Sequence, residues 1–247
     1  VRETLKYFNI NFGIEISIIS DIPSKGSGLG SSSALANALI LAISKLNEKN
    51  LTQKEICKIA IEIEIKILKK PIGIQDQYGT AIGGIKIISM NKSGIQIKKI
   101  KNKKLLSMIQ DNSIIFDTRK SRKAEEIIKK QKNLIKKNLK KLDNIREISM
   151  HIIKNIKKID INLFILNLNK SWQIKKNLEK KVSNNYIENK ILYLKKHNYH
   201  GFKLCGAGKG GFIFATSMKK NKSDDERFKN IKVDNEGVKI MFFDRNT

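Results

Sequence analysis

The stretch Pro23-Ser-Lys-Gly-Ser-Gly-Leu-Gly-Ser-Ser-Ser-Ala34 places three glycines within five residues and three serines at the start of an apolar helical pattern. Glycine adopts positive φ without steric cost, so the backbone of such a loop can approach a ligand closely. The helix that follows presents unpaired N–H groups and a partial positive charge at its first turn, which favours an anion. The sequence therefore predicts a phosphate-binding loop made of Gly26, Ser27, Gly28, Leu29, Gly30, Ser31, Ser32 and Ser33.

The spacing of this loop excludes two familiar types of nucleotide loop. No Gly-Lys-Ser/Thr closes it, as a Walker A loop requires, and it lacks the Gly-x-Gly-x-x-Gly dinucleotide fingerprint. Its serine hydroxyls can cap the helix, contact phosphate oxygens or ligate Mg²⁺, which prefers oxygen ligands. A glycine- and serine-rich turn without any ligand remains the alternative for the loop taken alone.

Hydrophobic periodicity outward from the loop predicts both strands and helices. One helix covers 31–46, and Thr52 with Glu55 predicts a capping box that opens a second helix ending near residue 68. A helical block follows from 120 to 196, in which the Lys-rich run 129–141 keeps an apolar stripe and is a helix rather than a disordered segment. The predicted strands are 12–20, 85–89, 95–100, 113–117, 202–204, 211–216 and 238–243, with a short charged helix between the last two.

Strands at both ends of a helical block indicate an α+β protein, and 247 residues suffice for two domains. We place the boundary near residue 110, which gives a nucleotide-binding domain at 1–110 and a second domain at 111–247. The sequence does not indicate an oligomeric state.

The net charge of +27 arises from 50 basic residues, only six of them Arg, against 23 acidic ones. Ile, Lys and Asn dominate the chain, as AT-rich codons favour, so the charge need not reflect selection for a partner. Scattered lysines, 6% aromatic residues and no zinc-finger spacing argue against nucleic acid as a partner. The basic field should instead attract anionic substrates such as nucleotides and sugar phosphates.

Cysteine usage and hydropathy indicate where the protein resides. Cys57 and Cys205 lie in unrelated contexts, which fits a reducing compartment and passive thiols. No signal-peptide pattern opens the chain, and no run of 18 uncharged apolar residues occurs. We therefore expect a soluble cytoplasmic protein that does not bind a membrane.

A second glycine-rich segment, Lys203-Leu-Cys-Gly-Ala-Gly-Lys-Gly-Gly-Phe212, stands near the C-terminus. Gly206, Gly208 and Gly211 formally spell Gly-x-Gly-x-x-Gly, but a strand rather than a helix is predicted to follow, so a Rossmann interpretation fails. A plain hairpin is the alternative for this segment by itself.

Both glycine-rich segments resemble motifs of the GHMP kinases, the first their second motif and the other their third. Between them, Ile61-Glu-Ile-Glu-Ile-Lys-Ile-Leu-Lys-Lys-Pro-Ile-Gly-Ile-Gln-Asp-Gln-Tyr78, followed by Gly83-Gly84, is similar to the D-glycero-D-manno-heptose 7-phosphate kinase branch of sugar kinases. Asn169-Lys-Ser-Trp-Gln-Ile-Lys-Lys176 resembles the C-terminal domain of that branch, so the similarity covers nearly the whole chain.

The resemblance implies a fold, an activity and two cofactors. The fold is a ribosomal S5-like N-terminal domain, incomplete here, followed by a ferredoxin-like α/β C-terminal domain. The activity is transfer of the γ-phosphate of ATP, with Mg²⁺, to a hydroxyl of a sugar or sugar phosphate. The best-guess acceptor is D-glycero-D-manno-heptose 7-phosphate.

The same resemblance assigns roles to individual residues. It implies that Asp76 is the catalytic base, that Ser32 and Glu64 hold Mg²⁺, and that Gly206, Ala207 and Gly208 support the nucleotide. Each assignment has an alternative: Asp76 as an Asx-turn or helix cap, and Glu64 as a solvated helix residue with Glu62 two positions away.

The anionic end of a sugar phosphate needs cations, and Lys25 and Arg122 are the candidates, although each can equally be one solvated charge among 50. The three histidines show no metal spacing, and Trp172 is expected in the core.

The chain also departs from the family pattern. GHMP kinases begin with a first motif, and this sequence starts after it, so we keep a catalytically inactive, truncated remnant that binds nucleotide or a partner as the alternative function. Ile74, Arg119 and Lys209 replace the residues expected at their positions, which blurs the identity of the substrate more than the reaction class.

Overall fold

The computed structural model describes residues 1–23, 26–120, 124–179, 182–221 and 223–244. It divides into two compact units, the first made of Val1–Ser24, Gly30–Lys99 and Asp234–Thr247, and the second of Lys25–Leu29 and Ile100–Val233. Both contain helices and antiparallel strands, which confirms the α+β class. The chain passes from one unit to the other inside the glycine-rich loop, between Leu29 and Gly30, whereas a single division at residue 110 stays a prediction.

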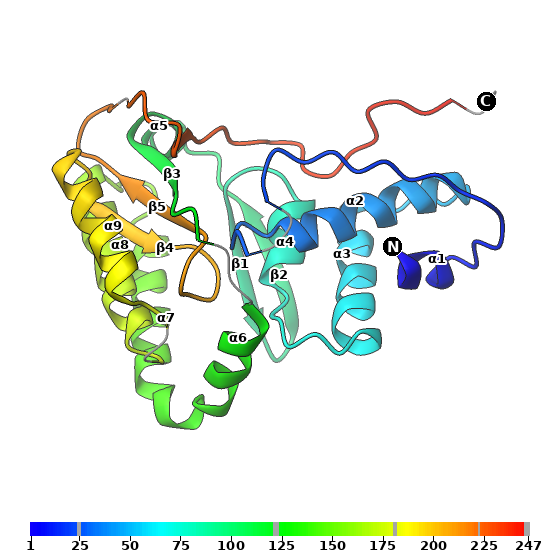
Figure 1. Cartoon of the computed structure of the whole chain (residues 1–247), viewed down its shortest axis with the longest axis horizontal. Coiled ribbons are helices and arrows are strands. Elements are labelled where there is room, and N and C mark those ends of the chain that lie inside the picture. The colour runs from blue at the N-terminus through cyan, green and yellow to red at the C-terminus, as the bar shows by residue number, and fades with distance from the viewer. Residues whose placement is uncertain (24–25, 121–123, 180–181, 222, 245–247) are drawn as a thin grey trace. The chain divides into compact units, whose positions relative to one another are not determined.

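The first unit is a group of helices followed by a two-stranded antiparallel hairpin (Figure 1). Its elements are α1 Arg2–Tyr7, α2 Ser31–Leu46, α3 Gln53–Ile61, the π-helical η1 Glu62–Ile67, α4 Gln75–Ala81, β1 Lys86–Asn91 and β2 Gly94–Lys99. The predicted capping box is confirmed, because the Thr52 hydroxyl accepts from the Glu55 N–H and the Glu55 carboxylate accepts from the Thr52 N–H. The helix predicted for 31–46 is confirmed as α2, and η1 continues α3 to the predicted end.

The core of this unit is packed from helix to helix. Leu39, Ile40 and Ile43 of α2 lie against Ile56 and Ala60 of α3 in one buried cluster. A second cluster joins α3 to α4 and the hairpin. This packing fixes α2 and α4, the two helices that carry Ser32 and Asp76.

The strand predicted for 12–20 is wrong. The segment is extended, but it joins no sheet among the described residues, and Phe12, Ile18 and Ile19 are exposed, Ile19 to 98%. Alternating apolar residues favour an extended backbone, whereas a strand also requires a partner that supplies its hydrogen bonds.

The second unit combines a four-stranded antiparallel sheet, in the order β4-β5-β3-β6, with helices beside it (Figure 1). Its helical elements are α5 Lys103–Asn112, α6 Ala124–Asn133, the 3₁₀ turn η2 Lys136–Asn138, α7 Leu139–Lys154, α8 Ile161–Lys176 and α9 Asn185–Lys196. Its strands are β3 Ser113–Asp117, β4 Gly201–Leu204, β5 Phe212–Thr216 and β6 Phe228–Asn230. The helical block and the strands at 113–117, 202–204 and 211–216 are confirmed.

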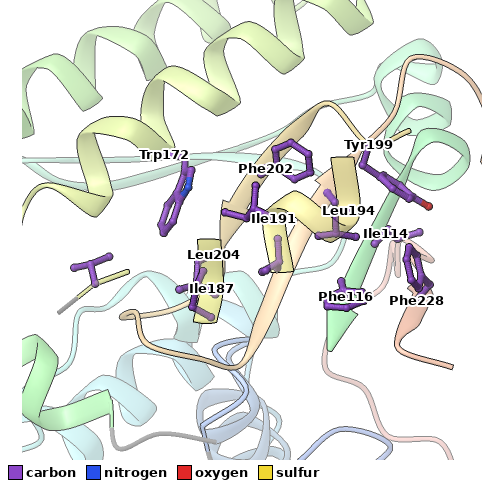
Figure 2. Packing of buried hydrophobic residues seen from close by; sticks show 13 residues of the cluster. Ile114, Phe116, Trp172, Ile187, Ile191, Leu194, Tyr199, Phe202, Leu204 and Phe228 are labelled. Carbon is purple, nitrogen blue, oxygen red and sulfur yellow. The ribbon is translucent and has the colours of Figure 1, made fainter. Parts of the chain in front are cut away.

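The core of the second unit lies between α9 and one face of the sheet. Figure 2 shows Ile191 and Leu194 of α9 with Phe202 and Leu204 of β4 in this cluster. Trp172 of α8 is 2% exposed and joins it, which confirms its expected place in the core. At the sheet edge, the Asn169 side chain accepts from the Phe202 N–H and donates to the His200 carbonyl, so α8 covers the backbone of edge strand β4.

The expectations for the last 40 residues are partly wrong. The described residues form neither a strand at 238–243 nor a charged helix after β5; β6 takes the outer place beside β3 instead. Val238 donates only a single backbone hydrogen bond, to Ala81. No helix in the described part of the chain is long and apolar enough to span a membrane.

Candidate functional site

The start of α2 lies against the helix that carries Asp76. Gly30 precedes α2 with φ 77°, a left-handed conformation that glycine adopts at least cost. A Cβ on Gly30 would lie 3.2 Å from the Thr80 methyl and 3.9 Å from Asp76 Cγ. In the first unit, the end of the glycine-rich loop and the proposed catalytic carboxylate are therefore neighbours.

Glu64 and Ser32, the two proposed metal ligands, are brought together. Glu64 is 2% exposed, and its Oε1 accepts from the Ser32 hydroxyl at 3.1 Å and from Lys70 Nζ at 3.0 Å. Glu62, the rival candidate, has its carboxylate 3.5 Å from the Tyr7 hydroxyl. Burial and the neighbouring Glu62 raise the pKa of Tyr7. The π-helical turn η1 thus presents only Glu64 to Ser32.

A buried polar network supports the other oxygen of Glu64. The Gln77 side chain donates from Nε2 to Glu64 Oε2 at 2.7 Å, and Gln77 is fully buried. Asn37 of α2, also fully buried, donates to the Gln77 carbonyl at 2.9 Å and to the Thr80 hydroxyl at 2.8 Å. Thr80 in turn donates to the Asp76 carbonyl at 2.8 Å, so one network fixes both α4 and Glu64.

Asp76 itself lies in the first turn of α4 and is exposed. The Thr80 hydroxyl donates to its backbone carbonyl, and its side chain lies beside Gly30. An exposed carboxylate on a rigid helix can accept a proton from, or orient, a hydroxyl placed beside it.

The first part of the glycine-rich loop belongs to the second unit, where it packs on β5. Gly26 and Gly28 have φ of 74° and 75°. Ser27 is buried, its carbonyl accepts from the Phe212 N–H at 3.1 Å, and its hydroxyl accepts from the Leu29 N–H at 3.3 Å. These contacts direct the Ser27 carbonyl into the protein.

The loop 206–211 is held through its carbonyls and its neighbours. Lys175 Nζ donates to the carbonyls of Leu204 at 3.0 Å and Gly206 at 2.7 Å, and the Gln131 side chain donates to the Ala207 carbonyl at 3.2 Å. The Lys209 N–H donates to the Val182 carbonyl at 2.9 Å. As predicted, a strand rather than a helix follows, since β5 begins at Phe212.

The other residues considered from the sequence are two cations and the cysteines. Lys25 and Arg122, proposed for an anionic substrate, lie outside the described residues. Burial raises the pKa of the Cys57 thiol to about 11, which keeps it protonated. No group of three or more His, Cys, Asp or Glu side chains suited to a metal occurs within the described ranges.

Several supporting residues have no role assigned from the sequence, among them Lys70, Gln77 and Lys175. Gln77 directly follows the proposed catalytic Asp76, and its helical position turns it inward, which a helical-wheel argument could have found. Lys70 and Lys175 are two lysines among 50 basic residues, and nothing in the sequence distinguishes them.

Comparisons with known proteins agree on one family. Residues 1–84 match the family model for the GHMP kinases N terminal domain. The D-glycero-alpha-D-manno-heptose 7-phosphate kinase of Campylobacter jejuni is 30% identical over 199 residues, covering 79% of this chain and 58% of that protein. The bifunctional fucokinase/GDP-fucose pyrophosphorylase of Arabidopsis thaliana is 25% identical over 227 residues, covering 87% of this chain and 21% of that protein.

A solved structure shares the fold. The D-glycero-D-manno-heptose 1-phosphate kinase from Bacteroides thetaiotaomicron matches with a TM-score of 0.63 at 18% identity, covering 89% of this chain and 65% of that one. The chain thus spans less than two thirds of each of these three proteins.

Proposed function

Because the chain belongs to the GHMP kinase family, we propose that it is an ATP- and Mg²⁺-dependent kinase that phosphorylates a hydroxyl of a sugar or sugar phosphate. D-glycero-D-manno-heptose 7-phosphate is the first acceptor to test, since the Campylobacter jejuni relative is named for that substrate. The observation that carries the proposal is the pairing of the Ser32 hydroxyl with the buried Glu64 carboxylate, in the unit where Asp76 adjoins Gly30.

Ser32 and Glu64 suit Mg²⁺ because both offer oxygen atoms, and the two side chains already stand 3.1 Å apart. Bound there, Mg²⁺ would neutralise charge on the phosphates of ATP. Gln77 and Asn37 hold Glu64 in place, so its position does not depend on the ligand.

Asp76 is the proposed general base. In the reaction, the acceptor oxygen forms a bond to the γ-phosphorus, the bond from that phosphorus to the ADP oxygen breaks, and the hydroxyl proton passes to the Asp76 carboxylate. Phosphoryl transfer needs positioning and charge neutralisation more than covalent help, which one carboxylate on a fixed helix supplies.

The glycine-rich loop is proposed to bind the phosphates through its backbone N–H groups and the first turn of α2. Gly206, Ala207 and Gly208 belong to the loop whose end, Gly211, packs against Ser27 in the second unit. Lys25 and Arg122 stay the proposed ligands of the anionic end of a sugar phosphate. The net charge of +27 would also attract such an anionic substrate.

The test is ADP release from the full chain with ATP, Mg²⁺ and a panel of hexoses, heptoses and their phosphates. We expect turnover with one acceptor and a fall of about 10²- to 10⁴-fold in kcat for Asp76→Asn, the usual contribution of a general base. Asp143→Asn, an exposed carboxylate of α7, is the matched control and should keep full activity. Measurable ATP binding without turnover on any acceptor would contradict the proposal.

The metal ligands have a control of their own within η1. Glu64→Gln should raise the Mg²⁺ concentration needed for half-maximal rate, whereas Glu62→Gln, two residues away and beside Tyr7, should not. Equal effects of the two substitutions would count against Glu64 as a ligand.

A further inference from the structure

The buried Glu64 carboxylate is paired with Lys70 and is also the proposed ligand of a metal ion. A buried carboxylate is strongly unfavourable unless it is paired and hydrogen-bonded. In the structure the charge is balanced by Lys70, whose Nζ lies 3.0 Å from Oε1. The proposed function, however, requires Mg²⁺ at the same carboxylate. Lys70 and Mg²⁺ would therefore both bind the Glu64 carboxylate.

The two oxygens of Glu64 are not equivalent. Oε2 accepts from Gln77 Nε2 at 2.7 Å, and Gln77 is fully buried and tied through its carbonyl to Asn37. Oε1 accepts from Ser32 and from Lys70, and the Lys70 side chain is 31% exposed. On Glu64, exchange of partners is therefore confined to Oε1, and Lys70 Nζ also lies 3.5 Å from the Ser32 hydroxyl, the other proposed metal ligand.

The backbone keeps Lys70 beside Glu64 even when its side chain moves. The Lys70 N–H donates to the Glu64 carbonyl at 3.0 Å, after Lys69 turns the chain back with φ 49° at the end of η1. The side chain is a flexible four-carbon stem with a strongly hydrated ammonium, so it can leave Oε1 for solvent while its Cα stays in place.

We propose that Lys70 is the resident counter-ion of Glu64 in the metal-free protein and that a divalent cation displaces it from Oε1. Like charges near one oxygen repel, so each cation lowers the affinity of the other. Lys70 then keeps the site charge-balanced when empty and weakens metal binding. The inference rests on the proposed metal site but not on turnover.

Mn²⁺ is the probe, and its binding to the full chain is measured by the electron paramagnetic resonance of the free ion. We expect Lys70→Met to bind Mn²⁺ about 5- to 150-fold more tightly than the unsubstituted chain, the usual range of coupling between two sites. Lys69→Met, the exposed neighbouring lysine, should leave the affinity unchanged. Lys70→Arg, which keeps the charge, should stay close to the unsubstituted chain.

Unchanged or weaker Mn²⁺ binding by Lys70→Met would overturn the inference, and so would no binding by either protein. Tighter Mn²⁺ binding in a protein that phosphorylates no sugar would support the inference and count only against the proposed function. A second readout needs no substitution: Mn²⁺ should speed acetylation of Lys70, mapped by peptide mass spectrometry, and leave that of Lys69 unchanged. Equal rates at Lys70 with and without Mn²⁺ would contradict displacement.

Discussion

The loops 26–30 and 206–211 are both rich in glycine, yet the surroundings of their glycines differ. A Cβ on Gly211 would lie 2.3 Å from the Ser27 carbonyl oxygen, and one on Gly208 would lie 2.7 Å from the Val182 backbone. A Cβ on Gly30 would meet first the Thr80 methyl, at 3.2 Å. Backbone atoms of a packed loop cannot give way, whereas a side-chain methyl can shift slightly.

Glycine spacing alone therefore does not reveal why glycine is needed. In the loop 206–211, glycine allows the loop backbone to pack directly against the backbone of Ser27 and Val182. In the other loop, Gly30 is needed for its φ of 77°, and the space around it is less tight. Substitutions should separate these two demands.

Gly211→Ala should have the largest effect. Ala at φ 88° costs about 1–2 kcal/mol, and overpacking against the Ser27 carbonyl adds roughly 1–3 kcal/mol. We expect urea unfolding to show a loss of about 3 kcal/mol in the free energy of unfolding. Gly79→Ala is the control, because it lies in helix α4 with nothing within 4 Å of its Cβ, and it should gain about 0.5–1 kcal/mol.

Lys175→Met should have the next largest effect, again in the loop 206–211. It removes the donor to the carbonyls of Leu204 and Gly206, and hydrogen bonds from a charged group contribute about 1.5–3 kcal/mol. We expect a loss near 2 kcal/mol, with faster hydrogen exchange confined to this loop. Lys170→Met, an exposed position of the same helix, should change neither quantity. Equal losses for both lysines would show that the carbonyl contacts do not matter.

Gly30→Ala should cost less stability than Gly211→Ala. The left-handed conformation costs about 1–2 kcal/mol for Ala, and the Thr80 methyl needs to move only slightly. The new methyl would also approach Asp76. Expressed as free energies, we therefore expect the loss in affinity for a fluorescent ATP analogue, or in kcat, to exceed the loss in the free energy of unfolding. A larger loss of stability than in Gly211→Ala would reverse the proposed distinction between the two loops.

Local patterns predicted much of this fold. The extents of α2 and β3 and the Thr52 capping box follow from side-chain periodicity and capping within a few residues, and all are confirmed. Pairing is not local: the chain at 238–243 has strand-like residues, yet Val238 gives a backbone hydrogen bond to Ala81 and the segment forms no strand. Phe228–Asn230, which was not predicted as a strand, pairs with β3. No pattern within a single segment shows which segments find a strand partner.

For the candidate site as well, some residues could be named before the structure was known and others could not. The resemblance to GHMP kinases named Ser32, Glu64 and Asp76, and the structure brings Ser32 to Glu64 and Gly30 to Asp76. Their roles stay proposals. The partners that hold them, Gln77 and Lys70, depend on how η1 ends and how α4 turns, which sequence spacing does not show.

The smallest predicted effect is a gain in stability, from Lys203→Met on β4, the strand that leads into the loop 206–211. Burial lowers the pKa of the Lys203 ammonium. Between this lowered pKa and the ordinary value, the unfolded chain binds more protons than the folded one, so stability rises with pH in that window. Below the window, the folded protein bears the full cost of burying the charge.

Methionine has a similar shape and no charge, so Lys203→Met should unfold at higher urea than the unsubstituted chain at neutral pH. The advantage should shrink as the pH rises through the window toward the ordinary pKa of lysine, where the unsubstituted side chain is neutral when folded. Lys195→Met, exposed on α9, should show neither the gain nor its pH dependence. A gain in stability that is constant with pH would come from packing rather than from charge. Burial of the Lys203 ammonium would then cost the folded protein no measurable free energy.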